Sequence, residues 1–153
     1  MTLDEYLSVG QTVAIGSYRF DAEAIKAFAS RYDPQPFHVD EGAARKSVFG
    51  ALCASGWHTA AAWMKCNVAT RSAVKWEGPG PEPEFGPSPG FSNLKWLKPV
   101  FAGETVSYAR TVTGHRPLAK RPGWHLVTVL AEGTDSTGTT VIQFESAVLL
   151  KAA

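Results

Sequence analysis

An aspartate and a histidine separated by two prolines are the residues of this chain best suited to do chemistry. Asp33 and His38 stand five positions apart, with Pro34 and Pro36 between them. Proline fixes its own backbone torsion and restricts the residue before it, so this segment can hold a carboxylate and an imidazole in one relative pose. Such a pair could activate water at neutral pH, because the unperturbed pKa of histidine is about 6.5.

Each of these residues also has an ordinary structural interpretation. Asp33 precedes a proline and could simply begin a turn. His38 could be a core histidine bonded to a backbone carbonyl, and Asp40 is interpreted as the N-cap of a short helical turn rather than as a catalyst. The residues alone therefore leave the catalytic and structural interpretations open.

The spacing of apolar residues predicts the elements that must position the pair. A strand is expected over 13–20, and a helix capped by Asp21 should follow and stop before Pro34. A second helix is expected from Gly56 to about residue 69. Because residues 47–64 contain no Asp, Glu, Lys or Arg, this helix is predicted to be buried on all sides within a soluble protein rather than to span a membrane.

The second half of the chain has the pattern of a sheet. The stretch 77–90 is rich in glycine and proline and is predicted to form no regular element. Alternating segments at 91–98, 104–113, 124–134 and 139–150 predict a meander of four strands. Strands that follow helices favour an α+β fold, in which an antiparallel sheet wraps the long helix.

Composition restricts the class of protein. The chain has 153 residues, 44% hydrophobic and 19% charged, with a net charge of +1; this predicts one globular domain over residues 1–153 and argues against nucleic-acid or membrane binding. The two cysteines, Cys53 and Cys66, form no disulfide or metal-binding pattern, and the first ten residues do not resemble a secretory signal. We therefore expect a cytoplasmic protein without a bound metal.

Three motifs in register make the chain resemble the MaoC-like dehydratases, which include the (R)-specific enoyl-CoA hydratases and have the hot-dog fold. Residues 33–40 match the family's loop at its aspartate, at its proline (here Pro36), at its histidine and at its final aspartate. Gly56 follows His38 by eighteen residues, at the glycine that opens the family's central helix. The run 94–104 matches an aromatic strand that ends on Pro-Val and then a glycine followed by an acid.

The chain departs from the family pattern at four positions in or near these motifs, the first being Tyr32 in place of the glycine before the aspartate. Gln35 replaces an asparagine, and Ser55 replaces the histidine that precedes the helix glycine. Met64 stands where some hydratases carry a serine. These changes leave the acid–base pair in place and bear on the choice of substrate and on activity.

The resemblance implies a hydratase or dehydratase that acts at the double bond of an enoyl or 3-hydroxyacyl thioester. His38 would be the base, Asp33 would orient it and the water, and the backbone N–H of Gly56 would stabilise the oxyanion at a helix N-terminus. No cofactor is implied, since coenzyme A would enter only as part of the substrate. Gly56 could instead serve only for close packing.

Substrate-binding residues are predicted in two places. Phe37, Ser55 and Trp57 adjoin the catalytic residues, and Trp57 could line an acyl tunnel. A basic stretch after the second strand of the meander could contact the phosphates of coenzyme A or an acidic acyl carrier protein, or could be a solvated loop; its cations are Arg116, Lys120 and Arg121.

The resemblance also predicts a homodimer, or a higher oligomer, with the acyl channel at the interface, because a wrapped sheet leaves edge strands to be paired. Two alternatives on the same fold stay open. One is an acyl-CoA thioesterase, and the other is a non-catalytic module that binds acyl thioesters.

Overall fold

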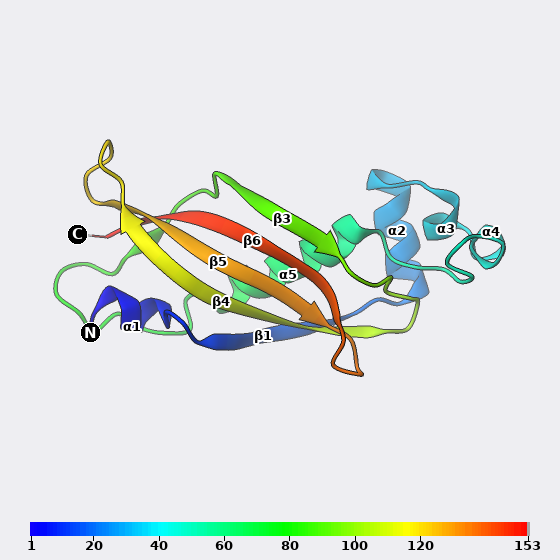
Figure 1. Cartoon of the computed structure of the whole chain (residues 1–153), viewed down its shortest axis with the longest axis horizontal. Helices are drawn as coiled ribbons and strands as arrows, with labels where there is room; N and C mark the ends of the chain where they lie inside the picture. Colours follow the sequence, from blue (N-terminus) through cyan, green and yellow to red (C-terminus); the bar gives the residue numbers. More distant parts are fainter. Residues whose placement is uncertain (153) are drawn as a thin grey trace.

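A curled antiparallel sheet holds one long helix against its concave side in this computed structural model, which describes residues 1–152 (Figure 1). The sheet has six strands in the order β1-β4-β5-β6-β2, and β3 also pairs with β6. The strands are β1 Thr12–Arg19, β2 Glu84–Phe85, β3 Gly90–Trp96, β4 Thr105–Pro117, β5 Trp124–Thr134 and β6 Thr140–Lys151. The helices are α1 Leu3–Leu7, α2 Ala22–Tyr32, α3 Pro36–Val39, α4 Glu41–Arg45 and α5 Gly56–Thr70. The predicted α+β architecture, a sheet wrapped around a long helix, is confirmed.

The predicted meander is wrong at its first strand. Strands β4, β5 and β6 form consecutive hairpins, but β3 pairs with β6 rather than with β4. The chain after β3 leaves the sheet and is bonded elsewhere: Ala54 N–H donates to the Val100 carbonyl at 2.8 Å, and Gly103 N–H donates to the Phe20 carbonyl at 2.8 Å. These bonds carry the chain across to β1, so that β4 begins beside β1.

Three other segments differ from prediction. A two-residue strand, β2, forms inside the proline- and glycine-rich stretch because Glu84 and Phe85 pair with the end of β6. Strand β4 runs to Pro117, so the first part of the basic stretch is strand rather than loop. Helix α1, capped by Thr2 and Glu5, had no counterpart among the predicted elements.

Helix α5 is buried on one side only. Trp63 is fully buried and donates its indole N–H to the Ala109 carbonyl at 2.9 Å. On the other side, Trp57, Met64 and Val68 are exposed by 49%, 40% and 48%. The prediction that the helix is buried all round is therefore wrong for a single chain, because one sheet can cover only one face of a helix. Within residues 1–152, no helix is both long and apolar enough to cross a bilayer.

Candidate active site

Asp33 and His38 are placed by the end of one helix and by a single turn of another. Asp33 is the C-cap of α2, where Pro34 stops the helix. Pro36 occupies the first position of α3, which suits a residue without an N–H donor. The segment predicted as a loop is thus partly helical, and His38 is held by backbone hydrogen bonds as well as by the prolines. Helix α4 then begins at Asp40, whose carboxylate accepts from Ala43 N–H at 2.7 Å, as predicted for an N-cap.

His38 is buried, and one of its ring nitrogens is committed to the backbone. Its Nδ1 lies 2.6 Å from the carbonyl oxygen of Cys53. A carbonyl can only accept, so Nδ1 carries the proton, and in the neutral ring Nε2 has a free lone pair. Nε2 lies 3.4 Å from Oδ2 of Asp33. His38 therefore makes the predicted bond to a backbone carbonyl through Nδ1, while its Nε2 still points at the Asp33 carboxylate.

Asp33 accepts hydrogen bonds at both of its oxygens. The Gln35 side-chain amide donates to Oδ1 at 2.7 Å, and the Ser55 hydroxyl donates to Oδ2 at 2.7 Å. Burial raises the pKa of Asp33, but the bonds from Ser55 and Gln35 and the nearby imidazole together lower it below its ordinary value. Asp33 is consequently a carboxylate at neutral pH. Two residues that depart from the family pattern, Gln35 and Ser55, are the ones that hold it.

Ser55 does two things with one hydroxyl. Besides donating to Asp33, its oxygen accepts from the backbone N–H of Trp57 at 3.2 Å and so caps α5. The residue is fully buried and lies behind the carboxylate rather than on the cavity wall. The structure therefore places this predicted substrate contact in a position where it orients Asp33.

The first residue of α5, Gly56, presents a free donor. His58 and Thr59 donate their N–H groups to the Ser55 carbonyl. Among the described residues, the Gly56 N–H has no acceptor, as expected for the open N-terminus of a helix. A donor at this end of α5, backed by the helix dipole, can stabilise negative charge on a bound group.

Trp96 explains why residue 56 has no side chain. A Cβ at Gly56 would overlap the Trp96 ring, and the Trp96 indole N–H donates to the Gly56 carbonyl at 2.9 Å. Trp96 also packs edge-to-face on Trp57, with ring centroids 5.0 Å apart. Sequence analysis did not single out Trp96; its place beside the Pro99-Val100 motif was the available signal that it belongs to the site.

These groups face one cavity of about 440 Å³. Asp33, His38 and Gly56 all line it, as do the predicted contact residues Phe37 and Trp57. A volume of this size suits a small organic molecule. The remaining walls are Gln35, Phe49, Cys53, Ala54, Thr59, Trp96, Leu97, Lys98, Pro99 and Val100.

The basic residues predicted to bind substrate lie elsewhere in the chain. Arg116 is near the end of β4, and Lys120 and Arg121 are in the turn that leads to β5. Figure 1 places this turn at the opposite end of the long axis from α2, α3 and α4. Within one chain, the structure does not bring these three cations to the Asp33–His38 cavity.

Cys53 is close to the imidazole but is not activated. Its Sγ lies 3.7 Å from Nδ1 of His38. Burial, and then the charge of Asp33, raise the pKa of the Cys53 thiol to about 11, so the thiol stays protonated at neutral pH. This environment is that of a buried core thiol and argues against a cysteine nucleophile.

Comparison with known proteins identifies the family. Residues 7–132 match the MaoC-like domain, and the chain belongs to that family. It is 35% identical to the MaoC-like dehydratase from Rhodospirillum rubrum, whose crystal structure it matches with a TM-score of 0.83 over 100% of this chain and 98% of that one. The predicted hot-dog fold is confirmed.

Two further proteins are similar to this chain, one in sequence and one in fold. The chain is 30% identical to the uncharacterised protein YdeM of Bacillus subtilis strain 168, over 99% of both chains. It also shares the fold of the (R)-hydratase from A. caviae, at 23% identity and a TM-score of 0.66 over 95% of this chain and 96% of that one.

Proposed function

We propose that this protein is a hydratase or dehydratase that adds water to, or removes it from, the double bond of an enoyl or 3-hydroxyacyl thioester. Family membership supports hydratase or dehydratase activity in general, and the R. rubrum relative is a MaoC-like dehydratase. One observation carries the proposal: the carboxylate of Asp33 and the free lone pair of His38 face each other at 3.4 Å, beside the unpaired N–H of Gly56.

Two hydrogen-bond acceptors only 3.4 Å apart are stabilised by a donor that lies beside them and contacts both. Water has two O–H groups, so one molecule close to both can donate to His38 Nε2 and to Asp33 Oδ2 together. Its lone pair then points away from both acceptors and toward the cavity. The pair thereby orients the nucleophile and stands ready to accept its proton.

In the hydration direction, the water oxygen bonds to the β-carbon of the enoyl thioester while one O–H bond breaks and its proton moves to His38 Nε2. The π electrons shift onto the thioester oxygen, where the Gly56 N–H and the N-terminal dipole of α5 stabilise the charge. The imidazolium, paired with the Asp33 carboxylate, then returns a proton to the α-carbon. Dehydration reverses these steps.

The thioester would be carried by coenzyme A or an acyl carrier protein, and a homodimer would bring a second copy's surface to the site. Strand β3 lies at an edge of the sheet and exposes apolar side chains, with Phe91 57% exposed. Trp57 and Met64 on the open side of α5 add to this exposed apolar surface. Unpaired edges and apolar patches of this kind are typical of interfaces between identical subunits.

The function is tested by following loss of the enoyl chromophore over a panel of enoyl-CoA substrates, with chiral analysis of the product. Asp33→Asn and His38→Ala should each lower the rate by about 10²-fold or more, the usual contribution of general acid–base groups. Asp40→Asn is the matched control, because asparagine caps a helix as well as aspartate does. It should leave the rate unchanged.

Three results would oppose the proposal. Undiminished turnover in both site variants would remove the mechanism. Release of free thiol with no loss of the enoyl group would indicate a thioesterase, and binding of acyl-CoA without turnover across the panel would indicate a non-catalytic module.

A further inference from the structure

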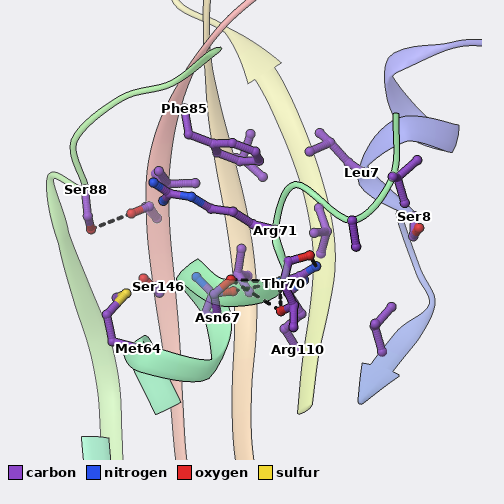
Figure 2. A pocket seen from close by; sticks show the side chains of 18 of the residues that line it. Leu7, Ser8, Met64, Asn67, Thr70, Arg71, Phe85, Ser88, Arg110 and Ser146 are labelled. Atoms are coloured by element: carbon purple, nitrogen blue, oxygen red, sulfur yellow. Dashed lines mark hydrogen bonds between the residues drawn. The ribbon is translucent and has the colours of Figure 1, made fainter. Parts of the chain in front are cut away.

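A second cavity lies at the other end of α5, and the proposed reaction does not use it. It has a volume of about 340 Å³ and is enclosed between the last turns of α5, helix α1 and the concave face of the sheet (Figure 2). Its walls are mainly apolar and include Leu7, Val13, Trp63, Val112, Val127 and Val129. It shares no lining residue with the cavity at Asp33 and His38.

Two arginines enter this apolar cavity, and their surroundings differ. Arg110 donates from Nη1 to the Asn67 amide oxygen at 3.1 Å and to the Thr70 hydroxyl at 3.0 Å, with longer bonds to the carbonyls of both residues. These bonds place it at the C-terminus of α5, where a cation complements the helix dipole. All four acceptors are neutral, so the charge of Arg110 is unpaired, although these hydrogen bonds hold its guanidinium in place.

Arg71 is the group that is free to bind. It extends across the cavity (Figure 2), and its guanidinium lies 5.0 Å from the centre of the Phe85 ring. Within residues 1–152, it makes no hydrogen bond or ion pair with another side chain. A guanidinium offers five N–H donors in a planar fork that matches a carboxylate.

The charge in this cavity is entirely positive. Its described lining contains no aspartate or glutamate; Glu82 accepts from the Tyr6 hydroxyl at 3.4 Å but is not part of the wall. Burial, and then the charge of Arg71, lower the pKa of Arg110. An anion placed between the two guanidiniums would relieve both effects, whereas a neutral apolar ligand would leave unpaired cations in a drier site.

We infer that this cavity binds an aliphatic chain that ends in a carboxylate, with the carboxylate on Arg71 and the chain against the valines of the sheet. The ligand could be a free fatty acid, or it could be the far end of an acyl substrate that carries a second carboxylate. Both sources have the same chemistry, and kinetics can distinguish them. The inference does not depend on hydratase activity, because binding can be measured directly.

The test is calorimetric titration of the full-length protein with octanoate and with 1-octanol, which has the same chain and no charge. Octanoate should bind at least tenfold more tightly than octanol, and Arg71→Gln should weaken octanoate binding at least tenfold while leaving octanol unchanged, as expected for hydrogen bonds to a charged group. Arg45→Gln, which removes an exposed arginine on α4, is the matched control and should change neither. Arg71 is preferred to Arg110 because its side chain makes no hydrogen bond among the described residues, whereas Arg110 is hydrogen-bonded to the last turn of α5.

Equal affinity for octanoate and octanol, absence of octanoate binding at millimolar concentration, or octanoate binding unaffected by Arg71→Gln would each overturn the inference. If octanoate competes with the enoyl thioester, and if Arg71→Gln lowers kcat/KM only for thioesters with a terminal carboxylate, the carboxylate belongs to the substrate. If octanoate binds without competing, it is a separate ligand. Both kinetic results support the site, and the calorimetric result stands even if the hydration assay shows no activity.

Discussion

Replacing Ser55 with alanine should destabilise the fold and remove one of the hydrogen bonds that hold the Asp33 carboxylate in place. The hydroxyl is fully buried, donates to the carboxylate at 2.7 Å and caps α5 through Trp57 N–H. A hydrogen bond to a charged group contributes roughly 1.5–3 kcal/mol, and loss of a serine N-cap costs about 1 kcal/mol. We expect Ser55→Ala to lower the free energy of unfolding by about 3 kcal/mol at neutral pH, and kcat to fall roughly tenfold as the carboxylate loses its fixed orientation.

The sign of the pH dependence follows from the lowered pKa of Asp33. An aspartate whose folded pKa lies below its unfolded value of about 3.9 stabilises the fold above that pH, and the contribution disappears as pH falls through the folded pKa. Ser55→Ala removes one cause of the lowering, so the pKa of Asp33 should rise. The difference in stability between wild type and variant should therefore shrink in strong acid.

Urea unfolding measures the stability, and NMR titration of ¹³C-labelled aspartate carboxyls measures the pKa. Asp21→Ala is the control, because Asp21 caps α2 through Ala24 N–H at 2.8 Å without contact with Asp33; it should cost about 1 kcal/mol and leave the Asp33 titration unmoved. Ser55→Thr keeps a hydroxyl and should restore most of both properties. The reasoning is refuted if Ser55→Ala costs no more than Asp21→Ala and the Asp33 resonance titrates as in wild type.

Three further predictions concern other parts of the molecule. Because the pKa of Cys53 is raised to about 11, iodoacetamide at pH 8 should leave the hydration activity intact, and Cys53→Ala should retain activity. Rapid inactivation of the wild type by iodoacetamide, with no inactivation of Cys53→Ala, would contradict this. Burial lowers the pKa of His58 to about 4, so on acidification the unfolded chain binds a proton at this residue before the folded chain does, and the free energy of unfolding should fall between pH 6.5 and 4 by at most about 1.4 kcal/mol per pH unit. His58→Phe should flatten this part of the pH profile measured by urea unfolding. An unchanged slope would show that other groups are responsible. If the protein forms the proposed dimer, Phe91→Glu on the edge strand β3 should give a monomer by light scattering at micromolar concentration, whereas Val48→Glu, at a site 92% exposed, should leave the mass unchanged. A wild-type protein that is already monomeric would reject the proposed dimer.

The parts of the fold that sequence predicted are those governed by local rules. Asp21 and Asp40 are N-caps as expected, and Pro34 ends α2. The pairing of β3 could not be predicted from its own pattern, since alternation indicates a strand but not its neighbour. That choice is made by bonds between distant segments, such as Gly103 with Phe20.

In the candidate site, too, the features set by local sequence were predictable and those set by contacts between distant segments were not. The Asp33–His38 pair and Gly56 were visible as a motif, because their relative pose depends on a short stiff segment and on one helix end. The roles of Ser55 and Trp96 were not visible, since each depends on a contact across 22 or 40 positions in the chain. Sequence reasoning treated Ser55 as a departure that put activity in doubt.

The contacts of Ser55 indicate how the Asp33 carboxylate is kept ionised and fixed in position. A carboxylate can orient water only if it is ionised and fixed, and here a serine hydroxyl and a glutamine amide supply both conditions from positions where the family pattern has histidine and asparagine. Because the Ser55 hydroxyl also caps α5, the carboxylate and the Gly56 N–H are joined through one residue. Any movement of α5 that displaces the Gly56 N–H must therefore also disturb Asp33, so the carboxylate proposed to orient the water and the donor proposed to stabilise the developing charge would move together.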